Sequence, residues 1–215
     1  MPVQSHDEAE RLAAAWQALT TWLAQHAPTS YASLLPPATE EEIATADSQL
    51  MRHVGYGLPA ELAALWRLCG GVEHQYIEEN EEAGEVGSGA FLPGGVILLS
   101  PAEALGPRLP QHGQRDGWGG VQVVPWLTRD EAGPLSGHYA GADGVGRWSN
   151  MDQPVGEPAY PSIAAYFETV HRALTEGLAD LMGDDVPGLV WGCLIWDNPE
   201  FSALDDAAGH WTPIH

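Results

Sequence analysis

The 215-residue chain contains no lysine, and its eight arginines face thirty aspartate and glutamate residues, which gives a formal net charge of −22 at pH 7. A surface of this sign repels the phosphate backbone of nucleic acids and the headgroups of anionic membranes, so we expect neither as a partner. It would attract a basic protein or cations instead. Acidity that serves only to keep the protein soluble explains the same charge equally well.

Cysteine is nearly as scarce, since Cys69 and Cys193 are the only two in the chain. Two cysteines so far apart provide no disulfide framework of the kind that small secreted domains use. The first ten residues have neither the basic segment nor the apolar core of a signal peptide, and no apolar run approaches the ~20 residues of a membrane span. We therefore expect a cytoplasmic protein with reduced thiols, long enough to form one domain around a substantial core.

The sequence also lacks the spacings that mark common catalytic and cofactor sites. It has no phosphate-binding glycine loop, no G-x-S-x-G nucleophile motif, and no H-E-x-x-H, CxxC or calcium-loop pattern. Cys69 could act as a nucleophile with His53 or His74 as its base, but a buried thiol at a helix C-terminus is the simpler interpretation, because the helix dipole raises its pKa. The glutamates near His74 could hold a metal, although a solvated acidic loop explains them better. We predict no catalytic residue, metal or other cofactor.

Helices are predicted where apolar residues recur every three or four positions. The predicted helices span residues 7–26, 40–54, 58–68, 101–105 and 161–182. Thr39 and Glu42 have the spacing of a capping box at the start of the second helix, and Ser100 and Glu103 repeat it before the fourth. Gly70-Gly71 ends the third helix, because glycine adopts a left-handed cap without strain. The second and third helices thus form a helical hairpin that must bury its apolar faces against another element.

Strands are predicted by β-branched and alternating segments over 96–99, 121–126, 136–140 and 145–150. Pro125 is expected near the end of its strand or on a sheet edge, because proline cannot donate to a ladder. Asp143-Gly144 predicts a two-residue turn that joins 138–142 to 145–150 as a hairpin. The tail could add one more strand over 189–196, and Trp191, Trp196 and Trp211 indicate that it packs on the rest of the chain.

The helical hairpin resembles a known family. Its run Pro-Pro-Ala-Thr-Glu-Glu-Glu-Ile at 36–43, the Leu-Pro-x-Glu-Leu at 58–62 and the glycine-ended helix are similar to the N-terminal half of the SUKH superfamily, which includes fungal cell-wall-assembly regulators and bacterial toxin-immunity proteins. The resemblance implies an α+β fold with a mixed or antiparallel sheet of about five to six strands and helices packed on it. It places an N-terminal helix at 1–27, a SUKH-like domain at 28–182 and a C-terminal extension at 183–215.

The remaining candidate site is the acidic segment that follows the hairpin, where glutamates accumulate without any arginine. We predict that this segment binds a basic protein through Glu73, Glu78, Glu79, Glu81, Glu82 and Glu85. Together with the resemblance, it favours a non-enzymatic immunity protein that binds and neutralises a toxin, for example a basic nuclease. A regulatory scaffold of the fungal type is the alternative, and a small hydrolase or metal-binding protein is a weaker one.

Overall fold

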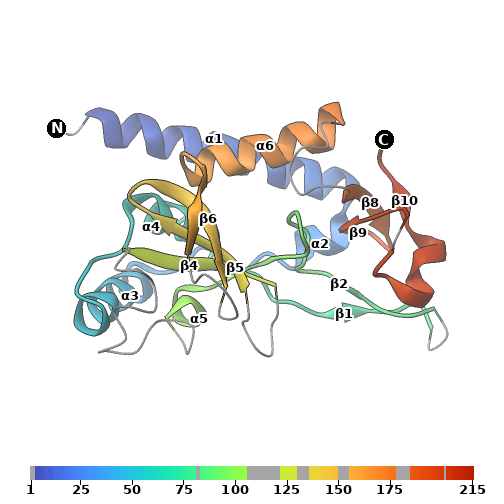
Figure 1. Ribbon diagram of the computed structural model, residues 1–215, viewed down its shortest axis with the longest axis horizontal. Coiled ribbons are helices and arrows are strands. Elements are labelled where there is room, and N and C mark those ends of the chain that lie inside the picture. The colour runs from blue at the N-terminus through green and yellow to red at the C-terminus, as the bar shows by residue number, and fades with distance from the viewer. Residues whose placement is uncertain are drawn as a thin grey trace.

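The computed structural model describes residues 3–80, 83–105, 122–129, 136–149, 155–177, 185–200 and 202–215. Its main sheet is antiparallel, with the strand order β3-β4-β5-β6-β7 (Figure 1). The strands are β3 (Ile97–Leu98), β4 (Val123–Thr128), β5 (Ser136–Gly141), β6 (Gly144–Ser149) and β7 (Val155–Tyr160). Helices pack on this sheet, so the predicted α+β class with a five-stranded sheet is confirmed.

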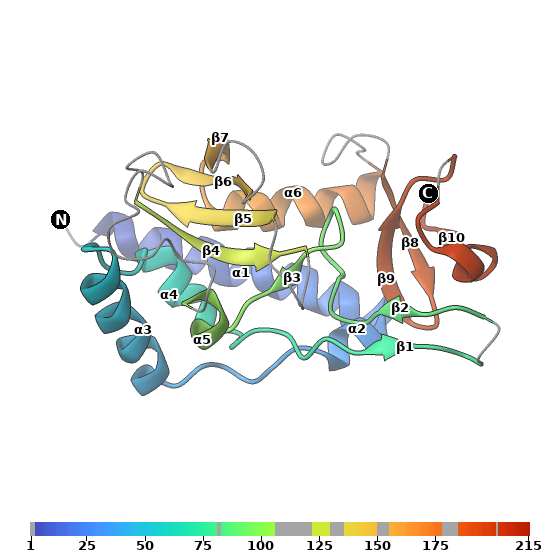
Figure 2. The ribbon, with the colours of Figure 1, turned by 60° about the horizontal axis from the view of Figure 1, so that its bottom comes forward.

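Two long helices, α1 (Val3–His26) and α6 (Ile163–Glu176), lie side by side over the sheet (Figures 1 and 2). Trp16 of α1 packs on Phe167 of α6 with ring centroids 5.0 Å apart, and Phe167 meets Trp126 of β4 edge to face at 5.7 Å. All three rings are buried. The apolar stripes that predicted the two helices therefore face one another and the sheet.

The predicted end of the last helix at residue 182 is wrong, because α6 stops at Glu176. Gly177 has a φ of 70°, and its N–H donates to the carbonyl of Ala173 at 3.2 Å. Glycine adopts this left-handed cap without the steric cost that a Cβ atom adds. Residues 178–182 of the predicted helix lie outside the described residues.

The shorter helices are α2 (Pro28–Ala32), α3 (Glu40–His53), α4 (Ala60–Trp66) and α5 (Pro101–Ala104). Both predicted capping boxes are present. Thr39 N donates to the Glu42 carboxylate at 2.7 Å, and the Thr39 hydroxyl accepts Glu42 N at 3.2 Å. Ser100 and Glu103 repeat this exchange at the start of α5. These caps fix where α3 and α5 begin, so sequence analysis located both helix starts correctly.

The hairpin between β5 and β6 is confirmed, but its turn lies one residue earlier than predicted. Gly141 pairs with Gly144, so the turn residues are Ala142 and Asp143. Gly144 is the first residue of β6, with a φ of 125°, and a Cβ atom there would lie 2.2 Å from the carbonyl oxygen of Tyr160. The glycine is therefore required by close backbone packing against β7 and not by the turn itself.

Pro125 is the third residue of β4 and not near its end, but β3 pairs with β4 only at Leu127 and Thr128, so Pro125 lies outside the stretch that β3 covers. The register of β4 on β5 shifts between Pro125 and Leu127. Such a bulge interrupts the ladder where proline has no N–H to donate, which makes an interior proline tolerable. Strand β7 was missed altogether, since its Gly156 and Pro158 are unfavourable in strands.

The tail forms its own three-stranded antiparallel sheet in the order β10-β8-β9, where we predicted a single strand. Its strands are β8 (Val186–Val190), β9 (Cys193–Asp197) and β10 (Thr212–Pro213), with a 3₁₀ helix, η2, at Asp205–His210. The turn between β8 and β9 has positive φ at Trp191 (47°) and Gly192 (77°). Thr29 fixes this turn through two hydrogen bonds. Its hydroxyl donates to the Trp191 carbonyl at 2.8 Å, and its backbone N–H donates to the Gly192 carbonyl at 2.9 Å. These bonds explain how a tryptophan keeps an unfavourable backbone conformation.

No helix in the described part of the chain is both long and apolar enough to cross a bilayer. The main core is formed mostly by buried side chains of α1, α3, α4, α6 and the main sheet. A smaller core joins β2 (Val86–Gly87) to the C-terminal sheet. Its members are Val86, Val190, Cys193, Ile195 and Ala207, with Ile77, Trp191, Leu204 and Trp211 packed against them.

Candidate functional site

The predicted acidic segment forms a two-stranded antiparallel hairpin, which we call the acidic ribbon (described residues 73–80 and 83–88). Strand β1 (Tyr76–Ile77) pairs with β2, with Tyr76 opposite Gly87 and Ile77 opposite Val86. Ser88 N donates to the carbonyl of Gln75 at 2.8 Å and extends the pairing by one residue. The ribbon runs beneath the C-terminal sheet at the end of the molecule away from α3 (Figures 1 and 2).

The two faces of the acidic ribbon differ in chemistry. Ile77 and Val86 contribute to the smaller core, which fixes the ribbon on the C-terminal sheet. A Cβ atom at Gly87 would lie 2.2 Å from the His74 ring, so the missing side chain lets His74 cover the strand. His74 in turn meets Tyr76 edge to face at 5.1 Å. Tyr76 is 61% exposed, which makes it the most exposed of the large apolar side chains in the described residues.

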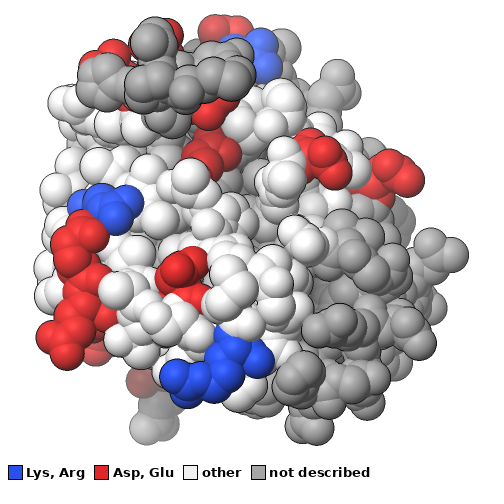
Figure 3. Space-filling model, turned by 90° about the vertical axis from the view of Figure 1, so that its left-hand side faces the viewer, with Lys and Arg blue, Asp and Glu red and all other residues white. Residues whose placement is uncertain are grey.

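Four of the six predicted partner-binding glutamates lie on this ribbon with exposed side chains: Glu73, Glu78, Glu79 and Glu85. Glu81 and Glu82 lie outside the described residues. No ion pair between described residues joins any of the four to an arginine. On the side of the molecule shown in Figure 3, by contrast, arginine and acidic side chains are neighbours. Arg67 pairs with Glu40 at 2.6 Å, and Arg11 pairs with Glu168 at 2.5 Å.

Sequence analysis missed the contribution of the C-terminal 3₁₀ helix to this surface. His210 Nδ1 lies 3.9 Å from the Glu79 carboxylate, and the His210 ring packs on Trp191 at 5.3 Å. Asp206 is exposed on the same helix, and its Cβ lies 3.3 Å from the position that a Cβ atom would take at Gly84. More than a hundred residues separate these side chains from the ribbon in sequence, so no local pattern could have indicated the contact.

The geometry limits what the acidic ribbon can do chemically. Within the described ranges, no three histidine, cysteine, aspartate or glutamate side chains are grouped closely enough to hold a metal ion. The four carboxylates project into solvent, where charges act over roughly 8–10 Å at physiological ionic strength. They are therefore suited to attracting a positively charged surface and to steering its approach.

Cys69, the one candidate nucleophile, is 1% exposed. Its thiol donates to the carbonyl of Gly71 at 3.1 Å, and burial raises its pKa to about 11. Burial raises the pKa of the Cys193 thiol to about 11 as well. A thiol that is protonated at neutral pH and closed off from solvent is a poor nucleophile, so both cysteines serve as small core residues.

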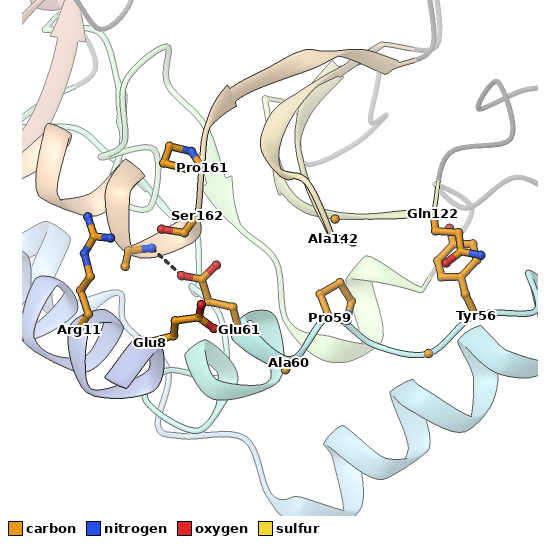
Figure 4. A pocket seen from close by; sticks show the side chains of 13 residues that line it. Glu8, Arg11, Tyr56, Pro59, Ala60, Glu61, Gln122, Ala142, Pro161 and Ser162 are labelled. Atoms are coloured by element: carbon orange, nitrogen blue, oxygen red, sulfur yellow. Dashed lines mark hydrogen bonds between the residues drawn. The ribbon is translucent and has the colours of Figure 1, made fainter. Parts of the chain in front are cut away.

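A cavity of about 540 Å³ opens between α1, α4 and the start of α6 (Figure 4). Its most buried acid, Glu61, accepts the backbone N–H groups of Ile163 and Ala164, both at 2.8 Å. Arg11, also in its wall, is engaged by Glu168. The principal charged groups of this cavity thus hold the three helices together. Their role is structural, and we assign the cavity no ligand.

Comparison with known proteins adds no relative to this description. No protein-family model matches the chain, and no curated protein matches it. The similarity of residues 36–71 to the SUKH superfamily therefore remains a resemblance of motifs.

Proposed function

We propose that the protein is a non-enzymatic binding module whose acidic ribbon binds a basic protein. The observation that carries the proposal is that Glu73, Glu78, Glu79 and Glu85 lie exposed on one hairpin and pair with no arginine in the part of the chain that the structure describes. Among the described residues only Glu79 has a possible counter-charge, His210 at 3.9 Å, so a basic partner would have few internal ion pairs to break.

The second element of the proposal is an anchor beside the charges. Tyr76 lies on the ribbon with 61% of its surface exposed, next to the His74 ring. Tyrosine is enriched among residues that dominate binding energy, because it buries a large rigid ring and offers a hydroxyl. It also attracts lysine and arginine side chains through its ring face. Carboxylates that attract a partner over a distance, together with an aromatic ring that the partner covers on binding, suit a protein partner better than a small ligand.

We further propose that the partner is a toxin that this protein neutralises. This step rests on the resemblance of the helical hairpin to immunity proteins and on the net charge of −22. Basic nucleases carry the opposite charge, and covering one would require an acidic surface that excludes nucleic acid. A gene for a large toxin next to the gene for this chain would support neutralisation, whereas an isolated gene would favour the scaffold role.

The test uses charge reversal on the ribbon. The variant Glu78→Lys/Glu85→Lys and a matched variant, Glu157→Lys/Glu176→Lys, change the net charge equally, and all four residues are exposed. Binding of the adjoining gene's product is followed by stopped-flow at low and high salt. We expect the ribbon variant to associate about tenfold more slowly at low salt, with a flatter salt dependence.

The control variant shares the change in net charge but not its location. It should associate within about twofold of the unchanged protein, because charges farther than a Debye length from the contact are screened. Equal slowing by both variants would show that overall charge alone matters. Unchanged association of the ribbon variant would exclude the ribbon as the binding surface.

A further inference from the structure

A groove of about 800 Å³ lies at the other end of the molecule from the acidic ribbon. It is bounded by α3, by α5 and by the extended segment 35–39, which Figure 2 shows running below α5 toward α3. The segment is fixed from beneath, because Gly70 N donates to the Pro36 carbonyl at 2.9 Å. A Cβ atom at Gly70 would lie 2.6 Å from the same oxygen, so the close approach depends on glycine.

The lining of the groove is mainly apolar, with Thr45, Gln49 and Ser100 among its polar members, and is partly open to solvent. Pro36, Pro37 and Ala102 are exposed, and Leu35 and Leu105 are half-buried. Prolines lose little conformational freedom when a ligand covers them, and the first turns of α3 and α5 are held by their capping boxes. The groove is therefore preformed, which reduces the entropy that binding must overcome.

The rim of the groove is acidic. Glu41 and Glu42 line it from the first turn of α3, and no arginine or histidine is among the lining residues. Glu42 uses one carboxylate oxygen in the capping box. Glu41 is exposed and takes part in no ion pair between described residues. An apolar channel with carboxylates at its edge complements a segment that carries apolar residues and positive charge together.

We propose that this groove is a second docking site, which binds an extended peptide segment with a central aliphatic residue flanked by arginine or lysine. The aliphatic side chain would lie against Leu35, Pro36 and Leu105, and a flanking basic side chain would approach Glu41. An acidic segment would be repelled by the same carboxylates, and nucleic acid would be excluded for the same reason. The site is separate from the acidic ribbon and does not depend on the function proposed for it.

The probe is a six-residue synthetic peptide with leucine and isoleucine at its centre and two arginines on each side. It is titrated into the ¹⁵N-labelled full chain, and amide chemical shifts are followed. We expect progressive, saturable shifts at Thr45, Gln49, Gly70 and Ala102, which line the groove. Any shifts at the ribbon residues Gln75 and Ser88 should appear equally with the peptide that has serine in place of the aliphatic pair, because only charge attracts the peptide there. A peptide with glutamate in place of arginine, and one with serine in place of the aliphatic pair, should each bind at least tenfold more weakly.

Two pairs of variants test the assignment. Glu41→Lys should weaken the arginine peptide about tenfold, whereas Glu78→Lys on the ribbon, with the same change in charge, should leave it within twofold. Ala102→Trp should fill the groove and abolish binding at unchanged charge, whereas Ala44→Trp, at an exposed α3 position outside the groove, should have no effect. No shifts at the groove amides up to millimolar peptide, or equal weakening by the Glu41 and Glu78 variants, would overturn the proposal. Either result would leave the ribbon test unaffected.

Discussion

Glu61 on α4 accepts the N–H of Ile163, the first residue of α6, at 2.8 Å, and its other carboxylate oxygen accepts the next N–H at the same distance. A side chain 102 residues earlier in the chain thus acts as a cap for the helix. The carboxylate also offsets the positive end of the helix dipole. Ser162, the local N-cap, satisfies the N–H of Ala165 at 3.0 Å. Three of the N–H groups that a helix start leaves unpaired therefore have acceptors.

Replacing Glu61 should weaken the start of α6. Glu61→Ala leaves two partly buried N–H groups without acceptors, and we expect a loss of about 2 kcal/mol in the free energy of unfolding. Urea denaturation followed by tryptophan fluorescence measures it. Glu8→Ala, in the wall of the same cavity, should change stability by less than about 0.5 kcal/mol, because Glu8 is exposed. A similar loss in both variants would contradict the capping role.

His138 should make stability depend on pH. It is 3% exposed and lies against Tyr166, with ring centroids 5.5 Å apart, and its Nδ1 has no hydrogen-bond partner among the described residues. Burial, with smaller contributions from the positive charges of Arg147 and Arg129, lowers its pKa to about 4. In the unfolded chain its pKa is about 6.5. The unfolded state therefore binds the proton first as the pH falls.

The contribution of His138 to the free energy of unfolding is constant above pH ~6.5. It falls by up to about 3 kcal/mol as the pH decreases to ~4, and then levels off. Urea midpoints measured across this range should show the fall. In His138→Gln the urea midpoint should change less steeply with pH over this range, although the variant is less stable throughout. Carboxylates whose pKa values are lowered by partners, such as Glu168 beside Arg11, also stabilise the folded state. They lose this stabilising contribution as the pH falls, equally in the unchanged protein and in His138→Gln. An unchanged slope would exclude His138 as its source.

The two thiols should be unreactive in the folded protein. Cys69 and Cys193 are 1% and 0% exposed, and burial raises the pKa of each to about 11. A disulfide reagent at pH 8 should therefore modify both in denaturant and neither within minutes in the native state. Fast labelling of Cys69 in the native chain would contradict its assignment to the core and reopen the nucleophile hypothesis.

Gly144→Ala should destabilise the sheet. The position has a φ of 125°, and the added methyl group would meet the Tyr160 carbonyl oxygen at 2.2 Å, so β7 must move. We expect a loss of about 2 kcal/mol or more in the free energy of unfolding. Gly209→Ala is the matched control, because a Cβ atom there has nothing within 4 Å. Equal stability of the two variants would show that β6 and β7 are not in close contact.

Sequence analysis predicted the features that depend on neighbours along the chain. The starts of α3 and α5 followed from Thr39 and Ser100, whose capping partners lie three residues away. The apolar faces of α1 and α6 followed from helical periodicity. The β5–β6 hairpin was located to within one residue. In each case the residues that decide the structure are close together in the sequence.

Features that depend on distant residues could not be predicted in this way. Pro125 is inside a strand because a bulge accommodates it, and β7 pairs despite its glycine and proline. Nothing local places His210 beside Glu79 or identifies Glu61 as the cap of α6. The acidic character of the ribbon was evident, but the C-terminal segment that completes its surface was not.

The bond between Thr29 and the carbonyl of Trp191 spans 162 residues, and the pair of Arg11 and Glu168 spans 157. During synthesis the ribosome therefore releases α1 and α2 long before their principal partners exist. Until α6 and the β8–β9 turn emerge, the apolar stripe of α1, with Trp16 and Trp22, has no α6 to cover it. For most of its translation the nascent chain thus exposes an apolar helix face of the kind that chaperones bind, and its native contacts can be completed only when the last quarter of the chain arrives.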